Sequence, residues 1–334
     1  MSEREISRRA LLAGASALGA SALLSSRLAR ALAAEDTGKL QIDDGLVVMP
    51  ARGQLYVASD FHTRHADFQK WLTRTNIVQR LKNEQDTYGL ILGDAVDQKA
   101  NDAQAEKDGD SRIVDKLREI HATLGENGKR LIVIQGNHEL EVVRIYEALK
   151  TQFGLNPQNR NLLVQALYQS KNGEFFQQFN FLERITDEQC AYLKGWPLAV
   201  LAKNGVVAVH ASPSSKIKSP KEIAQRQAKV ADELVWNRPA ELVLENGYTG
   251  EDLAAFLKMM EGSGVLISGH TPLGALPPAW VHNGVGVYAE HQLILATSYG
   301  SEGGEKSYLV MDLGKKYAAA NDLAMGREIQ RLEK

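Results

Sequence analysis

The chain has 334 residues, of which 44% are hydrophobic, enough for a sizeable core in one large domain or two smaller ones. Its 39 basic and 41 acidic residues nearly balance, so charge gives no reason to expect nucleic acid as a partner. A single cysteine, Cys190, excludes an internal disulfide, and the fold therefore needs no oxidising compartment.

The first 33 residues have the order of an export signal. Arg8 and Arg9 precede an apolar stretch, Leu11 to Leu24, that is shorter than the ~20 residues of a membrane-spanning helix. Ala31-Leu32-Ala33 then offers a cleavage site between small residues. Residues 1–33 resemble a twin-arginine signal peptide, which implies the twin-arginine export machinery as a partner and a periplasmic or secreted protein. The plainer alternative is a disordered basic tail.

Residues 34–53 are expected to form a leader and residues 54–334 a single domain. No later segment is long and apolar enough to act as a membrane anchor after signal removal. Five short apolar runs in this domain have the pattern of buried strands, and each ends in polar residues. The polar ends are Ser59-Asp60-Phe61-His62, Gly93-Asp94-Ala95-Val96-Asp97, Gly136-Asn137-His138-Glu139, His210 and Gly269-His270-Thr271.

Helices are expected between and beside these strands. Apolar spacing predicts a helix over 65–83, and Asp110 or Ser111 is expected to cap another over 112–124. Residues 140–195 are interpreted as a helical insert and a candidate substrate cap, with the phenylalanines of 175–181 as core rather than a substrate platform.

The second half of the domain is richer in strands. Asn204-Gly205 predicts a hairpin turn within 197–210, followed by helices at 219–234 and 250–260 and then by a run of strands. Strands alternating with helices and then a run of strands predict an α/β fold in which two packed sheets have helices outside.

The polar strand ends predict a metal site, because open α/β sheets bind ligands at the edge where their strands end. Carboxylate, imidazole and amide ligands together suit Mn, Fe or Zn. The five strands supply six candidate ligands: two aspartates, one asparagine and three histidines. Six protein ligands are too many for one ion with a vacant position, so two ions sharing a bridging carboxylate are expected. Paired ions ~3.5–4 Å apart lower the pKa of a bound water to ~7, which provides hydroxide for in-line attack on a phosphate ester.

In this combination and order, the five motifs resemble those of the calcineurin-like metallophosphoesterase superfamily over residues 54–313. The chain looks most like the phosphoprotein phosphatase branch and its bacterial relatives. The features that support this branch are Glu139, Arg144-Ile145-Tyr146, Trp196-Pro197-Leu198-Ala199, Val235-Trp236-Asn237-Arg238 and Pro272. The resemblance implies a four-layer α/β/β/α sandwich of two mixed β-sheets flanked by helices.

The resemblance also implies a set of metal ligands. One ion would be bound by Asp60 and His62, Asp94 would bridge, and the other ion would be bound by Asn137, His210 and His270.

The resemblance makes His138 the general acid that protonates the leaving oxygen, with Asp97 orienting its imidazole and raising its pKa. For Asp97 a plainer role as the cap of a turn stays open. Glu139 is expected to support the site rather than to bind an ion.

One departure concerns the phosphate. The branch usually has arginine after the second aspartate of its second motif, but this chain has Gln98 followed by Lys99. Lys99 or a distant arginine must then provide the positive charge, and Arg144 and Arg238 are the candidates. The plainer alternative for both arginines is a surface ion pair.

These observations predict an exported, dinuclear-metal-dependent phosphatase that hydrolyses phosphomonoesters, including phosphoproteins modified on Ser/Thr or Tyr. A phosphodiesterase or nucleotide pyrophosphatase is the first alternative, because a diester carries less charge and fits the missing arginine. A non-catalytic envelope binding protein is the second alternative, against which the complete ligand set argues.

Overall fold

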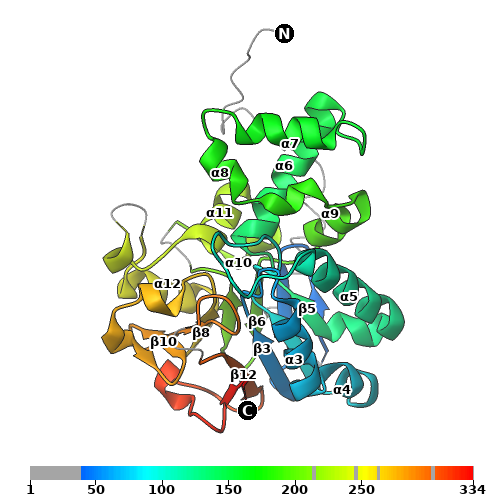
Figure 1. The fold of residues 1–334 in the computed structure, drawn as a ribbon. Coiled ribbons are helices and arrows are strands. Elements are labelled where there is room, and N and C mark those ends of the chain that lie inside the picture. The colour runs from blue at the N-terminus through cyan, green and yellow to red at the C-terminus, as the bar shows by residue number, and fades with distance from the viewer. Residues whose placement is uncertain (1–38, 213–215, 244–246, 262–263, 302–304, 334) are drawn as a thin grey trace.

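The computed structural model describes residues 39–333 apart from 213–215, 244–246, 262–263 and 302–304 (Figure 1). The signal peptide predicted for residues 1–33 lies outside the described residues. Within the described part of the chain, none of the helices has the length and apolar character needed to cross a membrane.

One sheet has five strands in the order β13-β12-β3-β4-β5. Strands β3, β4 and β5 run parallel, whereas β12 pairs antiparallel with both β3 and β13. Their bounds are β3 Gln54–Ala58, β4 Thr87–Ile91, β5 Leu131–Val133, β12 Ser307–Asp312 and β13 Ile329–Arg331.

The other sheet has eight strands in the order β1-β2-β6-β7-β8-β11-β10-β9 and is also mixed. Strands β7 and β8 run parallel, and β6 and β7 form the predicted antiparallel hairpin around Asn204-Gly205. The bounds are β1 Gln41–Ile42, β2 Leu46–Met49, β6 Ala199–Ala202, β7 Val207–Val209, β8 Leu266–Ser268, β9 Val281–His282, β10 Val285–Tyr288 and β11 Gln292–Leu295.

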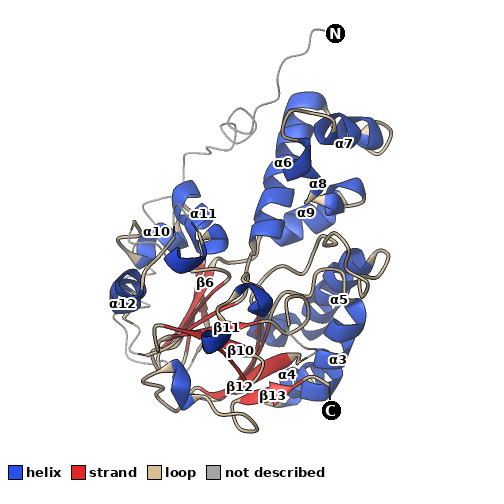
Figure 2. Ribbon diagram, turned by 60° about the vertical axis from the view of Figure 1, so that its left-hand side comes forward, coloured by secondary structure: helices blue, strands red, loops and turns tan. Residues whose placement is uncertain are grey.

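Helices lie outside both sheets, and α6 to α9 form a separate lobe beyond one end of the strands (Figures 1 and 2). The α-helices are α3 His65–Thr75, α4 Ile77–Asn83, α5 Gly109–Leu124, α6 Asn137–Phe153, α7 Arg160–Tyr168, α8 Gly173–Gln177, α9 Asp187–Lys194, α10 Pro220–Ala224, α11 Ala228–Trp236 and α12 Gly250–Met259.

Three apolar layers hold these parts together. The first lies between the two sheets, the second between the five-stranded sheet and helices α3 to α6, and the third between the eight-stranded sheet and helices α10 to α12. Alternate residues of a strand point to opposite faces, so each central strand supplies two layers. The predicted four-layer α/β/β/α architecture is therefore confirmed. Side chains that represent the three layers in turn are Val57 and Leu90, Trp71 and Leu117, and Leu234 and Phe256.

The segment 34–53 is not a leader throughout its length, which corrects the sequence interpretation. All four residues of β2 are buried, and this strand pairs in parallel with β6, so that Leu46 is opposite Ala199. Residues 46–49 are therefore an interior strand of the larger sheet, contributed by the start of the domain and completed by a hairpin 150 residues later.

Two of the predicted helices are each divided in two by a single residue. Asn76 adopts a left-handed conformation that separates α3 from α4, and Arg226 does the same between α10 and α11.

The helix cap predicted at Asp110 or Ser111 is wrong. Helix α5 begins at Gly109 with no side-chain cap, and Asp110 is fully buried in its first turn, where it forms an ion pair with Arg184. Asp110 thus joins α5 to the helical lobe.

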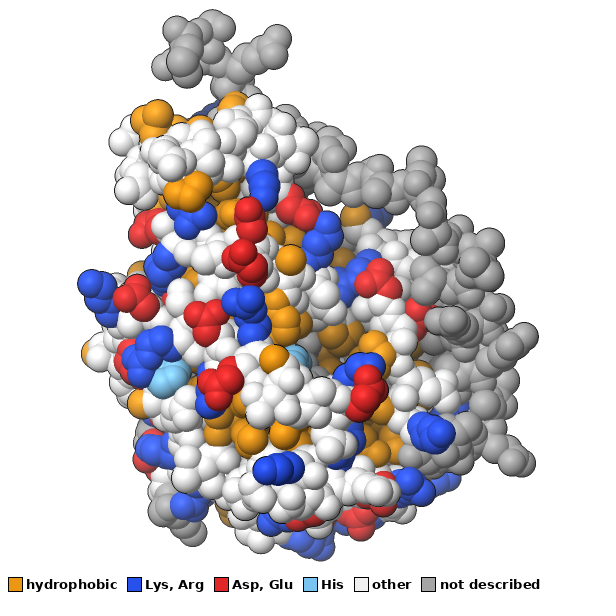
Figure 3. Space-filling view, turned by 90° about the vertical axis from the view of Figure 1, so that its right-hand side faces the viewer, with side chains coloured by type: hydrophobic (Ala, Val, Ile, Leu, Met, Phe, Trp, Pro, Cys, Tyr) orange, Lys and Arg blue, Asp and Glu red, His pale blue; other side chains and the backbone are white. Residues whose placement is uncertain are grey.

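The face drawn in Figure 3 carries basic and acidic side chains interspersed with one another. This mixed pattern agrees with the near balance of charge in the sequence, on which the expectation of no nucleic-acid partner was based.

Leu46→Ala tests whether β2 belongs to the folded core. We expect the free energy of unfolding to fall by about 2–5 kcal/mol, because a fully buried leucine leaves a cavity. Ile42→Ala in the neighbouring β1, where the side chain is 55% exposed, should change it by less than about 0.5 kcal/mol. Urea denaturation measures both, and equal small changes would restore the leader interpretation.

Candidate metal centre

The motif residues follow the ends of five strands that belong to both sheets. Strands β3, β4 and β5 lead to the first three motifs, and β7 and β8 of the larger sheet lead to His210 and His270. Main-chain hydrogen bonds join neighbouring loops at this edge. The Asp60 amide donates to Gly93 O (3.2 Å), the His62 amide to Asp94 O (2.9 Å) and the Gly269 amide to His210 O (2.8 Å).

The backbone turns sharply at five of the motif residues. Positive φ values of 39–66° occur at Asp60, His62, Asp94, Asp97 and His270. Side chains disfavour this left-handed region, and each such residue costs of the order of 1–3 kcal/mol unless its surroundings enforce it. Part of the backbone strain of the chain therefore lies where it presents its polar side chains.

Two glycines allow these side chains to approach the neighbouring loops. A Cβ atom at Gly136 would lie 2.2 Å from Asp94 Oδ1, and one at Gly269 would lie 2.3 Å from Asp60 Oδ2. Any larger residue at either position would displace a carboxylate.

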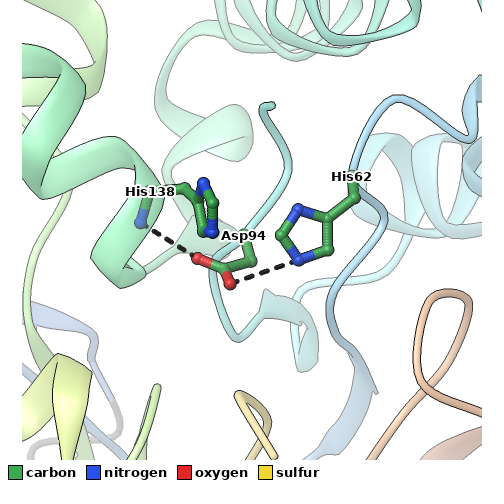
Figure 4. A group of neighbouring side chains, drawn as sticks. All are labelled: His62, Asp94 and His138. Atoms are coloured by element: carbon green, nitrogen blue, oxygen red, sulfur yellow. Dashed lines mark hydrogen bonds and ion pairs between the residues drawn. The ribbon is translucent and has the colours of Figure 1, made fainter. Parts of the chain in front are cut away.

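The carboxylate of Asp94 lies at the centre of the cluster (Figure 4). Its Oδ2 is 3.3 Å from His62 Nε2, and its Oδ1 is 3.3 Å from His210 Nε2. The Nδ1 atom of each histidine faces main-chain carbonyls, those of Val96 and Asp97 for His62 and that of Leu92 for His210. A proton on Nδ1 then leaves the Nε2 lone pair directed at Asp94, as in metal-binding histidines.

Asn137 brings a second pair of imidazoles together. Its Oδ1 lies 3.1 Å from His210 Nε2 and 3.0 Å from His270 Nδ1. Asp60 contacts the same region, because its carboxylate accepts hydrogen bonds from the His270 amide at 3.1 and 3.3 Å. Asp94, His210 and His270 form one group with metal-ligand spacing, and His62, Asp94 and His138 form another.

The charge balance of this cluster fits bound cations. Burial opposes a charge on His210, yet the carboxylates of Asp94 and Asp60 raise the pKa of His210 to about 9. Burial also raises the pKa of Asp60 to about 7 against the opposite effect of His210. The Nε2 atom of His270 is buried without a hydrogen-bond partner among the described residues. Lone pairs and carboxylates that converge away from water require positive charge, and a mixed carboxylate, imidazole and amide set suits Mn, Fe or Zn.

Glu139 supports the centre without joining it. Its carboxylate accepts hydrogen bonds from the amides of Asp94 (2.9 Å), Ala95 (2.7 Å), Val96 (3.2 Å) and Gly136 (2.8 Å). It thereby fixes the loop after β4 to the start of α6. The expected supporting role agrees with this geometry.

His138 lies between the carboxylate of Asp97 and the ammonium of Lys99. Its Nδ1 is 2.8 Å from Asp97 Oδ2, and its Nε2 is 2.5 Å from the ammonium of Lys99. Burial and Lys99 hold the pKa of His138 well below its usual value. The contact at Nδ1 agrees with the expectation that Asp97 orients the imidazole. The predicted effect of Asp97 on the pKa of His138 stays a prediction.

A cavity of about 250 Å³ opens beside the cluster. Of the three predicted phosphate contacts, Lys99 and Arg238 line it, and Arg144 does not. Arg144 instead pairs with Glu141 and Asp232, so its plainer interpretation as an ion-pair residue holds. No side-chain hydrogen bond or ion pair to another described residue engages the Arg238 guanidinium. Six further lining residues were not predicted as site residues. Trp236, Thr271 and Pro272 lie in motifs that the sequence analysis quoted, whereas Gln178, Ala296 and Tyr299 carry no sequence signal and are placed by the fold.

Taken together, the strand-end site and the layered sheets define a metal-dependent phosphoester hydrolase. The chain matches the family model described as calcineurin-like phosphoesterase over residues 53–274 and belongs to this family. No curated protein sequence matches the chain.

Solved structures of related fold include phosphatases at low sequence identity. A protein serine/threonine phosphatase from Saccharomyces cerevisiae has a TM-score of 0.50 and 13% identity, over 87% of this chain and 81% of that one. The cold-active protein-tyrosine phosphatase of a psychrophilic Shewanella species has a TM-score of 0.46 and 12% identity, over 84% and 80% of the two chains. A metallophosphoesterase from Sphaerobacter thermophilus has a TM-score of 0.41 and 15% identity, over 78% and 84%. At these identities the likeness concerns the fold alone.

Asp94→Asn tests the metal centre directly. We expect the variant to retain fewer ions per chain than the parent after reconstitution with Mn²⁺ or Zn²⁺, because Asp94 contacts both histidine groups. Elemental analysis after gel filtration gives the stoichiometry. Asp86→Asn, which alters an exposed aspartate paired with Arg52, is the matched control. Equal metal content in all three proteins would contradict the assignment.

Proposed function

We propose that this protein is a dinuclear-metal phosphomonoesterase. The observation that carries the proposal is that one cavity joins five of the six proposed metal ligands, all except His210, to two further cations, Lys99 and Arg238. A phosphate monoester carries more negative charge than a diester, so two side-chain cations beside the metal cluster favour the monoester. Lys99 takes the place expected of the arginine that Gln98 replaces.

Each described residue has a separate task in this scheme. The bound ions would supply an activated water and stabilise the phosphate oxygens. Arg238 and Lys99 bind the outer oxygens of the phosphate and hold them during the reaction. Burial lowers the pKa of Arg238, but a guanidinium stays charged at neutral pH.

His138 lines the cavity, and the leaving oxygen of the substrate receives its proton from this side chain. Asp97 fixes Nδ1 of this imidazole, so Nε2 is the atom that faces Lys99 and the substrate. His138 is the general acid in this scheme and passes a proton from Nε2 to the leaving oxygen, while the neighbouring Lys99 ammonium holds the phosphate oxygens.

Hydrolysis of an aryl phosphate by the metal-loaded protein tests the proposal. We expect turnover that depends on Mn²⁺ or a similar ion, and a fall of about 10²–10⁴-fold in kcat for His138→Ala, the range typical of a lost general acid. Asp94→Ala should abolish turnover, whereas Asp86→Asn should retain it. Full activity in both site variants, or none in the parent protein, would refute a phosphatase.

The same assay separates the two enzyme classes when a bis-aryl phosphate and phosphorylated Ser, Thr and Tyr peptides are included. Preference for the bis-aryl substrate would assign a phosphodiesterase.

We also propose that the protein is exported through the twin-arginine route to the periplasm or beyond. The support is the order of residues 1–33: paired arginines, a mildly apolar stretch and a small-residue cleavage site. Replacing Arg8 and Arg9 by lysine should keep the mature-size protein out of the periplasmic fraction of a bacterial host. An unchanged distribution between fractions would contradict this route.

A further inference from the structure

Beyond the first turn of α6, which carries Asn137 and His138, the helical lobe contacts the site through the segment Gln178 to Phe181. Gln178 lines the cavity, and the ring of Phe179 lies 5.4 Å from that of His138. The amide of Phe181 donates a hydrogen bond of 2.6 Å to Asp97 Oδ1. The lobe therefore touches both partners of the Asp97–His138 pair.

Asn180 makes a two-point connection between the lobe and the loop after β4. Its Oδ1 accepts a hydrogen bond from the Gln98 amide at 3.0 Å, and its Nδ2 donates to the Gln98 carbonyl at 2.8 Å. One carboxamide thus satisfies both main-chain groups of a single residue. These two hydrogen bonds fix the peptide group before Gln98 and the peptide group after it, which leads into Lys99.

Lys99 is the residue whose position depends on that peptide. Its long side chain spans from an exposed loop to His138 Nε2, and its ammonium lies 5.7 Å from the centre of the Tyr299 ring. A lysine side chain has high conformational freedom, so its ammonium is well placed only where its own main chain is fixed.

We propose that Asn180 is a positioning residue, which holds Lys99 in the cavity by clamping the main chain of Gln98. The insert of residues 140–195 then serves the reaction by ordering the loop that carries Lys99. This inference rests on the proposed function, because Lys99 is the phosphate contact in that scheme.

The lobe has other anchors, so the Asn180 side chain is not needed to dock it. Arg184 pairs with the buried Asp110 of α5, at 2.9 Å between Nε and Oδ1, and Phe179 and Phe181 are fully buried in the core. Removal of the Asn180 carboxamide should therefore loosen the Gln98–Lys99 loop while the lobe stays in place.

A double-mutant cycle on the metal-loaded, full-length protein tests this inference. Lys99→Ala should lower kcat/KM for an aryl phosphate by about 10²-fold, as for loss of one donor to a reacting phosphate. Asn180→Ala should lower it by about tenfold, mainly through KM, and should weaken inhibition by inorganic phosphate to a similar degree. In the Lys99→Ala background, Asn180→Ala should cause no further loss, because both act through one contact.

Two results would overturn the inference. The first is parent-like kinetics for Asn180→Ala. The second is a loss for Asn180→Ala that is equal in both backgrounds, which would show a role independent of Lys99. Gln177→Ala, which alters an exposed side chain three residues away, is the control and should match the parent.

Amide hydrogen exchange provides a readout that does not need activity. The Gln98 amide should exchange about tenfold faster in Asn180→Ala than in the parent or in Gln177→Ala, because it loses its acceptor. Unchanged exchange would refute the clamp. If the parent hydrolyses no phosphate ester, the proposed function fails, while exchange and the binding of inorganic phosphate still decide whether Asn180 orders Lys99.

Discussion

The structure depends on a concentration of lone pairs that face one another away from water. Two oxygens of Asp94, the amide oxygen of Asn137 and the imidazoles of His62, His210 and His270 converge over a few ångströms. Such an arrangement is unfavourable by itself, since buried acceptors and carboxylates lose their hydration. Cations turn the same arrangement into a binding site, so the cost of assembling it and the affinity for metal have one physical origin.

Several features of the fold hold the side chains of this cluster in place. Left-handed residues end the strands, glycines admit the carboxylates, and Glu139 gathers four main-chain amides from two loops. The first turn of α6 contributes as well, because the His138 amide donates to Asp94 Oδ1 at 3.2 Å, where the helix dipole favours a carboxylate. Packed sheets on both sides keep these local strains from relaxing.

The centre could be predicted from the sequence because its ligands follow short apolar strands, a local pattern that survives without knowledge of tertiary contacts. The cavity wall could not, since Trp236, Tyr299 and Gln178 come from three distant segments that only the fold brings together. The strand β2 was missed for a similar reason. Four apolar residues near the start of a domain have no local partner, and their pairing with β6 is set by the sheet.

Charge was also harder to predict than position. Arg144 and Arg238 are equivalent as isolated arginines, but one meets two acidic side chains and the other opens onto the cavity. For His138 the sequence indicated Asp97 as a neighbour of Nδ1 but gave no sign that the Lys99 ammonium reaches Nε2. Both outcomes depend on distances that spacing along the chain does not encode.

The strand order also determines when the centre can form during synthesis. Strand β3, which leads to Asp60 and His62, lies between β4 and β12, and His270 is more than two hundred residues away from Asp60. Contacts this distant in sequence form late, so the ligand set is complete only after His270 has emerged from the ribosome. Ion uptake is then a post-translational event. If the proposed twin-arginine export holds, the cytosolic metal pool would select the ions, because that route transports folded proteins.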